Sequence, residues 1–208
     1  MEVALYGTAD LAFWREQLAR ESLFPLNVNG KAEVLISVPH LLWKGVRFNE
    51  LSISIGVSAR EDGGTPDGFF LPHAFNSNRL LAFMERMFFQ TPYYYAEVQV
   101  SEQIPARFAV KHGAETAFKG RMIGKRDPVR REVEHFEGPV HLPGGKYFTA
   151  RISGLTDFYP FSDEDVLSVN GVRETVFGWL RASNFIPLEW RIRGDAVHGK
   201  SRTFRRNS

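Results

Sequence analysis

The chain contains no cysteine among its 208 residues. This absence excludes disulfides, thiolate catalysis and cysteine-ligated zinc or iron–sulfur centres, and it agrees with a reducing compartment. Long hydrophobic runs are also absent, since no apolar stretch approaches the roughly 20 residues that a membrane-spanning helix needs. The N-terminus lacks the basic and apolar regions of a signal peptide. We therefore expect a cytoplasmic protein without a membrane partner.

An excess of charge of one sign is lacking too. Lys and Arg number 26 against 24 Asp and Glu, for a net charge of +2, which is too small to indicate a polyanionic partner by itself. Basic residues gather between 119 and 131, and others lie between 200 and 206, but acids dilute the first group and no groove-reading motif accompanies either. We predict solvated surfaces there and no nucleic-acid partner.

Motifs for cofactors are missing. The segment 142–146, LPGGK, lacks the spacing of a phosphate-binding loop, and there is no dinucleotide fingerprint, nucleophile elbow or HExxH. Two histidines and a carboxylate, His135, Glu137 and His141, are ligand types that suit iron or zinc. Because Pro139 lies between these residues, the sequence does not show whether their side chains share one face of the strand. No second metal-binding motif accompanies them. We predict neither a metal site nor an organic cofactor.

What the chain does contain is a pattern of many strands and few helices. Apolar residues make up 43% of it, including 18 phenylalanines, and a chain of this length can bury about 70% of its unfolded surface. No repeat or long linker divides it, so we expect one domain over 1–208, with a disordered basic tail at 199–208. The pattern predicts an α+β fold or a decorated barrel. Periodicity predicts helices at 10–21, 75–89 and 162–182, and strands at 32–38, 46–59, 93–100, 106–111, 115–123, 133–136, 146–153 and 188–194.

Within the predicted strand 46–59, apolar residues alternate with Glu50, Ser52 and Ser54. The simpler interpretation puts this polar face in solvent. If the sheet curls into a barrel, the same face lines the interior, where a buried carboxylate has a raised pKa and can act as an acid or a base.

The predicted helix 75–89 and the strand after it carry a second set of candidates. Arg79 and Arg86 lie seven residues apart on one helix face. Their guanidinium groups are either solvated or bind an anion such as a carboxylate or phosphate. Tyr93, Tyr94 and Tyr95 follow in a strand, where tyrosines serve as packing residues or as hydrogen-bond donors to a pocket. We predict ligand binding by Arg79, Arg86 and Tyr95.

These segments together resemble the acetoacetate decarboxylase-like superfamily. The resemblance rests on Asn49-Glu50-Leu51, the turn at 61–68, the stretch GFFLPHAFNSNRLLAFMERMFFQTPYYYAEV from residue 68 and the hairpin 106–123, and it covers roughly residues 30–125. It implies a closed antiparallel β-barrel with a central cavity and a few flanking helices. The likeness is strongest to an uncharacterised branch of that superfamily.

The resemblance also implies which residues build the site. The decarboxylase uses a strand glutamate, a helix-terminal arginine and a following Pro-Lys-Lys, one lysine of which forms a Schiff base. Glu50 and Arg86 match the glutamate and the arginine, and Pro92 matches the proline. Tyr93 and Tyr94 stand where the lysines should be. Tyrosine cannot form an imine, so Schiff-base chemistry at that position is excluded.

Other lysines remain as alternatives, because Lys111 and Lys119 on the next hairpin are placed to project a replacement amine. Our main expectation is acid–base chemistry of a lyase or isomerase type, with Glu50 as acid or base and Tyr93 or Tyr94 as hydrogen-bond donor. The ligand expected is a small anionic or carbonyl-bearing organic molecule. Monomer and homo-oligomer are both compatible with the sequence.

Two rival functions stay open. The first is a binding or sensing module that uses the same cavity without turnover. The second is a structural or interaction protein whose interior is filled by its own phenylalanines. A fold alone does not choose between them, because one fold hosts many functions.

Overall fold

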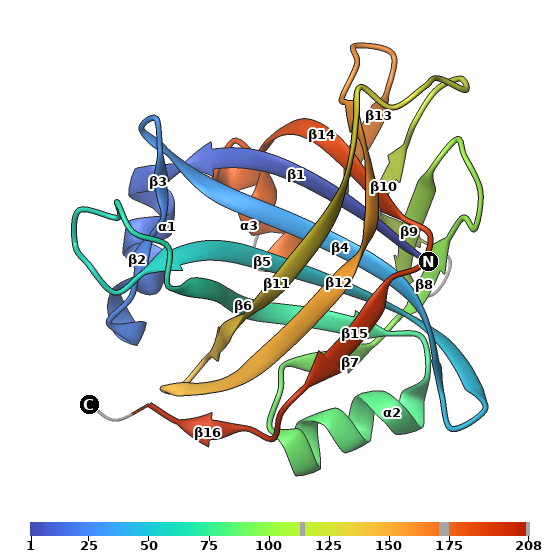
Figure 1. Ribbon diagram of the computed structural model, residues 1–208. Helices are drawn as coiled ribbons and strands as arrows, with labels where there is room; N and C mark the ends of the chain where they lie inside the picture. The colour runs from blue at the N-terminus through green and yellow to red at the C-terminus, as the bar shows by residue number, and fades with distance from the viewer. Residues whose placement is uncertain (113–114, 171–174, 207–208) are drawn as a thin grey trace.

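A computed structural model describes residues 1–112, 115–170 and 175–206, and over these residues the chain is mostly β with three α-helices (Figure 1). The elements are β1 (Glu2–Asp10), α1 (Leu11–Leu18), η1 (Ala19–Glu21), β2 (Phe24–Pro25), β3 (Asn27–Val28), β4 (Lys31–Trp43), β5 (Val46–Ser58), β6 (Gly68–Asn76), α2 (Arg79–Met84), η2 (Glu85–Phe89), β7 (Tyr93–Tyr95), β8 (Glu97–Val100), β9 (Arg107–His112), β10 (Glu115–Arg121), β11 (Arg130–Leu142), β12 (Lys146–Pro160), β13 (Val166–Val169), α3 (Val176–Ala182), β14 (Ile186–Arg193), β15 (Val197–Lys200) and β16 (Phe204–Arg205).

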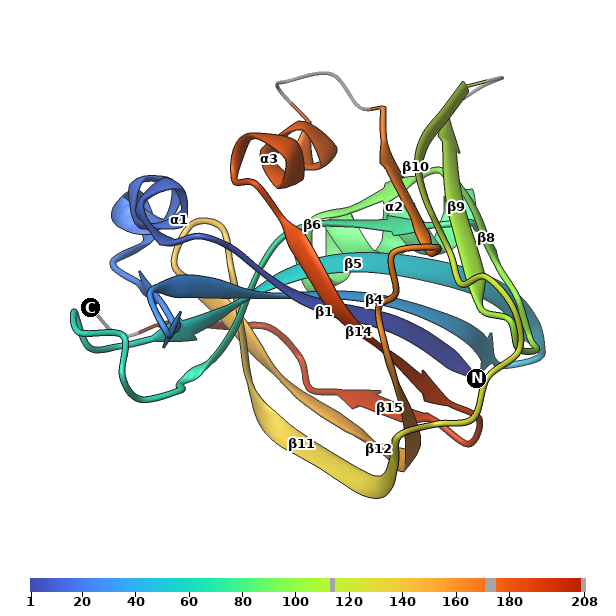
Figure 2. The ribbon, with the colours of Figure 1, turned by 90° about the horizontal axis from the view of Figure 1, so that it is seen from above.

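Two sheets contain these strands. The larger has the order β2-β5-β4-β1-β14-β12-β11-β6-β7, with β3, β15 and β16 attached at its sides, and the smaller has the order β13-β10-β9-β8. In the larger sheet β6 also pairs with β5. Figures 1 and 2 show this sheet strongly curved. Most pairings are antiparallel, as expected, but β6 runs parallel to both β11 and β7, which corrects the prediction of a wholly antiparallel sheet.

The two faces of the β4–β5 hairpin have different environments because side chains alternate along each strand. On β5, Leu51, Ile53 and Ile55 are fully buried in the main hydrophobic core. The opposite face carries Glu50, Ser52 and Ser54, which border a cavity. The alternation of strand 46–59 therefore separates a packed side from a hollow side of the same sheet.

Aromatic side chains fill the main core where α3 and the smaller sheet pack against the larger sheet (Figure 2). Phe177 of α3 stacks on Phe75 and on Phe118, with ring centroids 5.1 Å apart in both pairs. Trp190 of β14 lies 5.9 Å from Phe108. Burial of rings this large is the main stabilising contribution of such a core, at roughly 25 cal/mol per Å² of apolar surface.

The predicted helix 75–89 is shorter than expected at its start. β6 continues to Asn76, and α2 begins at Arg79, where Asn78 caps the helix by accepting from the backbone N–H groups of Leu80 and Leu81. Asn76 lies before the helix because it is paired in the strand, directly opposite Glu50. The helix continues as the π-helical turn η2.

The predicted helix 162–182 is wrong over its first part. Residues Val166–Val169 form strand β13, and α3 begins only at Val176, while 171–174 lie outside the described residues. Asp165 does not start a helix, because its buried carboxylate accepts from the Ile123 backbone N–H and from Trp190 Nε1. These tertiary hydrogen bonds outweigh the local capping signal at Ser162.

The C-terminal segment, for which sequence analysis predicted a disordered tail from residue 199, pairs with β12. β15 pairs with residues 150–153 of β12, and β16 pairs with Lys146 and Tyr147. β12 spans 15 residues, but β14 pairs only with residues 156–160 of this strand. The remaining residues of the same edge of β12 are therefore available to pair with the segment up to Arg206. Residues 207–208 of the predicted tail lie outside the described part of the chain.

Candidate functional site

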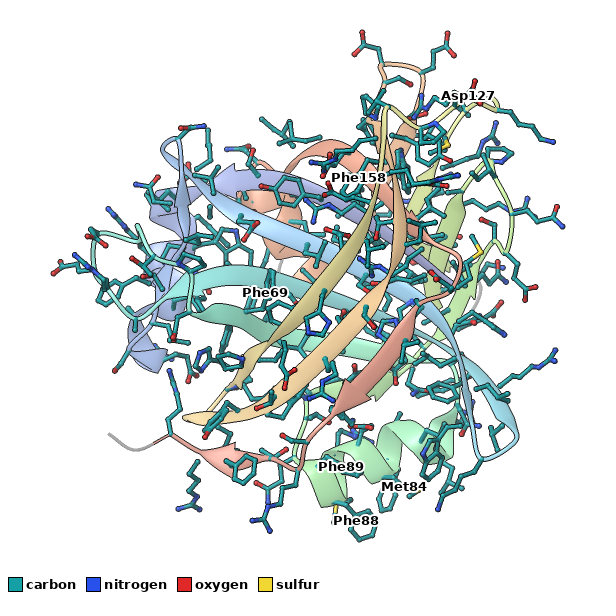
Figure 3. All side chains as sticks on the ribbon, viewed as in Figure 1. Phe69, Met84, Phe88, Phe89, Asp127 and Phe158 are labelled. Atoms are coloured by element: carbon teal, nitrogen blue, oxygen red, sulfur yellow. The ribbon has the colours of Figure 1, made fainter. Side chains whose placement is uncertain are left out.

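A cavity of about 760 Å³ lies on the hollow side of the larger sheet. Its walls come from β4, β5, β6, β11 and β12, and α2, η2 and β15 line it as well. Apolar side chains such as Phe48, Phe69, Phe136 and Phe148 make up much of its surface. Figure 3 marks Phe69 on the sheet, and Met84 and Phe89 on the helix below it. Charged side chains of the lining gather in two clusters.

The first cluster centres on Glu50. Asn76 Nδ2 donates to Glu50 Oε1 at 2.9 Å, and the Tyr93 hydroxyl also bonds to this carboxyl. Burial raises the pKa of Glu50 to about 7, with a further upward contribution from Glu85, against the lowering effects of Lys200, Tyr93 and Asn76. Burial, followed by the charge of Glu50, raises the pKa of Tyr93 well above its usual value. A carboxyl in this state can give or take a proton near neutral pH.

Lys200 completes this cluster from the far end of the chain. Its ammonium pairs with Glu85 Oε1 and lies 4.6 Å from the centroid of the Phe89 ring. Thr91 Oγ1 donates to the other oxygen, Glu85 Oε2, at 2.7 Å. The cavity therefore contains an amine as well as a carboxyl, both on its lining.

The second cluster is an ion network around Glu2. Ser37 Oγ donates to Glu2 Oε1 at 2.6 Å, Arg193 pairs with Glu2 and with Glu134, and His198 Nε2 lies 3.4 Å from Glu2 Oε2. Burial would raise the pKa of Glu2, but His198, Arg193 and Ser37 together outweigh it and lower the pKa to about 2. This network joins β1, β11, β14 and β15 at the cavity wall.

The residues predicted from sequence divide into two groups. Glu50 and Tyr93 line the cavity, whereas Tyr94, Tyr95 and the two arginines are not part of its lining. The guanidinium of Arg86 lies 5.1 Å from the Tyr94 ring, and that of Arg79 lies 4.5 Å from the Tyr95 ring. Strand alternation explains why Tyr94 faces away from Tyr93, and the two arginines stack on exposed tyrosine rings instead of lining the cavity.

Several other sequence candidates are also placed elsewhere. Lys111 Nζ lies 3.6 Å from Glu97 in the smaller sheet, and Lys119 is exposed on β10, so neither supplies an amine to the cavity. His135 lies 3.8 Å from Glu137, whereas His141 approaches Asp67. Across 1–112, 115–170 and 175–206, no group of three or more His, Asp or Glu side chains is arranged to hold a metal ion.

Sequence reasoning missed Lys200, Glu85 and Asn76 as site residues. Asn76 and Glu85 were placed in the predicted helix 75–89, and Lys200 was placed in the predicted tail. The alternation of His198 and Lys200 around Gly199 is the only local sign that this segment is a strand with one polar face.

Comparison with known proteins identifies the fold. No family model and no curated protein matches the sequence. Solved structures do match. An acetoacetate decarboxylase-like enzyme from Sphingomonas wittichii RW1 has 12% identity and a TM-score of 0.54, covering 96% of this chain and 91% of that one. Acetoacetate decarboxylase from Legionella pneumophila subsp. pneumophila str. Philadelphia 1 has 11% identity and a TM-score of 0.59, covering 97% and 83%. The fold is acetoacetate decarboxylase-like.

A third match is the enduracididine biosynthesis enzyme MppR, complexed with the condensation product of pyruvate and imidazole 4-carboxaldehyde. It has 11% identity and a TM-score of 0.55, covering 95% of this chain and 86% of that one. The acetoacetate decarboxylase-like fold thus extends over nearly the whole chain, well beyond the residues 30–125 that carried the resemblance in sequence. Among the described helices, none is both long and apolar enough to cross a membrane.

Proposed function

We propose that this protein binds a small organic acid or carbonyl compound in its cavity and transfers a proton there. The observation that carries the proposal is the half-buried Glu50 carboxyl on the cavity lining, whose pKa is raised to about 7 beside the Tyr93 hydroxyl. Near pH 7 such a carboxyl is about half protonated, which is the state that suits a general acid or base.

In this proposal each polar group of the first cluster has a role. Glu50 moves the proton, and Tyr93 donates a hydrogen bond to the carbonyl or enolate oxygen. Lys200 holds the negative end of the ligand, the role that sequence analysis had assigned to Arg86. The volume of about 760 Å³ favours a ligand over a filled interior. The product held by MppR, formed from two carbonyl compounds, supports the same substrate class.

We further propose that the larger sheet is a closed barrel around this cavity. Support comes from β6, which pairs with β5 on one side and with β11 on the other, so that a path of paired strands leads from β5 through β4, β1, β14, β12 and β11 back to β6. A closed arrangement would keep the Glu50 carboxyl away from bulk water.

Lys200 favours a second candidate, imine formation. Its amine is on the cavity lining, next to the Glu85 carboxylate. The neutral amine would add to a substrate carbonyl, and loss of water would leave the C=N bond. Reduction with borohydride in the presence of pyruvate or acetoacetate, followed by peptide mass spectrometry, tests this candidate: a mass increase on Lys200 supports it, and an unmodified Lys200 contradicts it.

Proton transfer is tested by hydrogen–deuterium exchange at the carbon next to the carbonyl of pyruvate and acetoacetate in D2O, followed by NMR. We expect the wild-type protein to accelerate exchange and Glu50→Gln to lose this activity by about 100-fold or more. Glu16→Gln is the matched control, because Glu16 is an exposed carboxylate on α1.

The outcomes separate the rival functions. Acceleration that survives Glu50→Gln contradicts the role of Glu50. Ligand-observed NMR that detects binding without any exchange indicates a non-catalytic binding module, and absence of binding for both compounds contradicts the proposed ligand class.

A further inference from the structure

The helical segment α2–η2 is apolar on two sides. Leu81, Met84 and Phe89 line the cavity. On the other side Leu80 is 65% exposed and Phe88 is 72% exposed, and Figure 3 shows Phe88 at the outer side of the helix, away from the sheet. A helix that is apolar all round is normally covered on all sides. The outer side of this one is open to solvent in the single chain.

The tip of the β4–β5 hairpin carries a second exposed apolar group. Leu42 is 65% exposed and Trp43 is 46% exposed. Figure 1 shows this tip projecting beyond the sheet near one end of α2, and the two segments contribute side chains to the same cavity. We call the exposed side chains of 42–47 and 79–88 the outer face. Exposed apolar side chains gathered in this way are typical of interaction sites.

The exposed charges of the outer face are all positive. Lys44 and Arg47 are exposed on the hairpin tip, and Arg79 and Arg86 are exposed on the helical segment. Glu85 belongs to the same segment, but its side chain is mostly buried and is paired with Lys200. On β8 and just after it, Glu97 and Glu102 are in ion-pair range of Lys111 and His40.

This charge distribution decides between the two simplest partners. A second copy of the chain related by a twofold axis would bring the same four cations together, because an isologous interface meets its own surface, and no exposed acid within 42–47 or 79–88 would compensate them. An anionic lipid surface attracts all four at once, at about fivefold in affinity for each basic residue near it.

We propose that the outer face binds the surface of an anionic lipid bilayer, a partner that the sequence analysis did not predict. Trp43, Phe83 and Phe88 enter the interface between headgroups and acyl chains, where aromatic rings are favoured. The four basic side chains bind lipid phosphates. The apolar side chains project from a hairpin tip and a helix rather than from a groove, and such projections fit a fluid bilayer without a shaped partner. This contact is peripheral, and it includes Leu42 and Trp43, which also line the cavity.

The test is co-sedimentation of the full chain with vesicles of phosphatidylglycerol and phosphatidylcholine in equal parts, compared with vesicles of phosphatidylcholine alone. We expect binding to the anionic vesicles that weakens at high salt, because salt screens exposed charges. The double substitution Phe83→Ser/Phe88→Ser is expected to lower binding by tenfold or more, and Arg79→Gln/Arg86→Gln by roughly 25-fold. Val133→Ser, at an exposed apolar residue of β11, is the control and should bind as the wild type does.

Circular dichroism establishes that each variant is folded, which is expected because the substituted side chains are exposed. Absence of binding to anionic vesicles by the folded wild type overturns the proposal, as does equal binding by the Phe83→Ser/Phe88→Ser variant. A dimer in light scattering that dissociates in that variant, together with no vesicle binding, would assign the outer face to a second copy instead.

Discussion

Replacing Glu50 by glutamine tests the electrostatics of the cavity through the stability of the whole protein. The folded pKa of Glu50 is raised from the ordinary value of 4.5 to about 7, chiefly by burial. In the unfolded chain the carboxyl ionises at the ordinary value, so between these two pH values the folded state binds more protons than the unfolded state. The free energy of unfolding of the wild type therefore falls as pH rises through this window.

The size of this effect follows from the two pKa values. They correspond to a roughly 300-fold difference in proton affinity between the folded and unfolded states, or about 3 kcal/mol. Glutamine does not titrate, and its side-chain oxygen can still accept from Asn76 Nδ2, whose bond to Glu50 is 2.9 Å. We expect Glu50→Gln to gain about 3 kcal/mol in stability relative to the wild type between pH 4.5 and pH 7.5.

Urea denaturation of both proteins at a series of pH values measures this difference, and other titrating groups cancel because the two chains share them. Glu16→Gln, which removes an exposed carboxylate, serves as the control and should follow the wild type. A stability difference between Glu50→Gln and wild type that stays constant across the window would show that burial does not raise this pKa.

Four further predictions concern the cavity and its surroundings. Arg193→Met should cost about 3–5 kcal/mol in urea denaturation, because it leaves the buried Glu2 carboxylate without its partner; a loss below 1 kcal/mol would mean that His198 suffices. The pKa of Glu2 is lowered to about 2, so the stability that its carboxylate contributes is fully present above pH 4.5 and should disappear as pH falls toward 2. In Glu2→Gln, the free energy of unfolding should depend less on pH over this range. Lys200→Met should weaken ligand binding at least tenfold in NMR titrations, and unchanged affinity would exclude Lys200 as the anion-binding group. Gly68→Ala should lower the unfolding free energy by about 1–3 kcal/mol or more, since Gly68 has a φ of +135° and a Cβ there would lie 2.1 Å from the Pro139 carbonyl oxygen; a neutral result would require the backbone to shift at that position.

Much of the fold was predictable because local patterns and tertiary packing agree there. The alternation in strand 46–59 predicted one apolar and one polar face, and the structure puts Leu51, Ile53 and Ile55 in the core and Glu50 at the cavity. The resemblance to acetoacetate decarboxylases, which rested on residues 30–125, is confirmed and extends over nearly the whole chain.

Local patterns failed where distant partners compete with them. Ser162 and the acids after it resemble a helix start, yet Asp165 is held by Trp190 and the backbone of Ile123. Leu80 and Phe88 have the helical spacing typical of a stripe that packs on the core, yet both side chains are exposed. The side of the same helix that carries Leu81 and Met84 lines the cavity instead. Spacing alone does not say which side of a doubly apolar helix meets the sheet.

The amino-acid sequence by itself determined the strand-rich pattern, the polar face that carries Glu50 and the absence of a lysine at positions 93 and 94. Only the tertiary structure decided that Lys200 reaches Glu85 and that Arg79 and Arg86 turn away from the cavity. Alternation of side chains between two faces is set by the geometry of a single strand. Which side chains meet across the cavity depends instead on pairing between distant segments, and Lys200 and η2 are more than a hundred residues apart. No local pattern encodes that pairing.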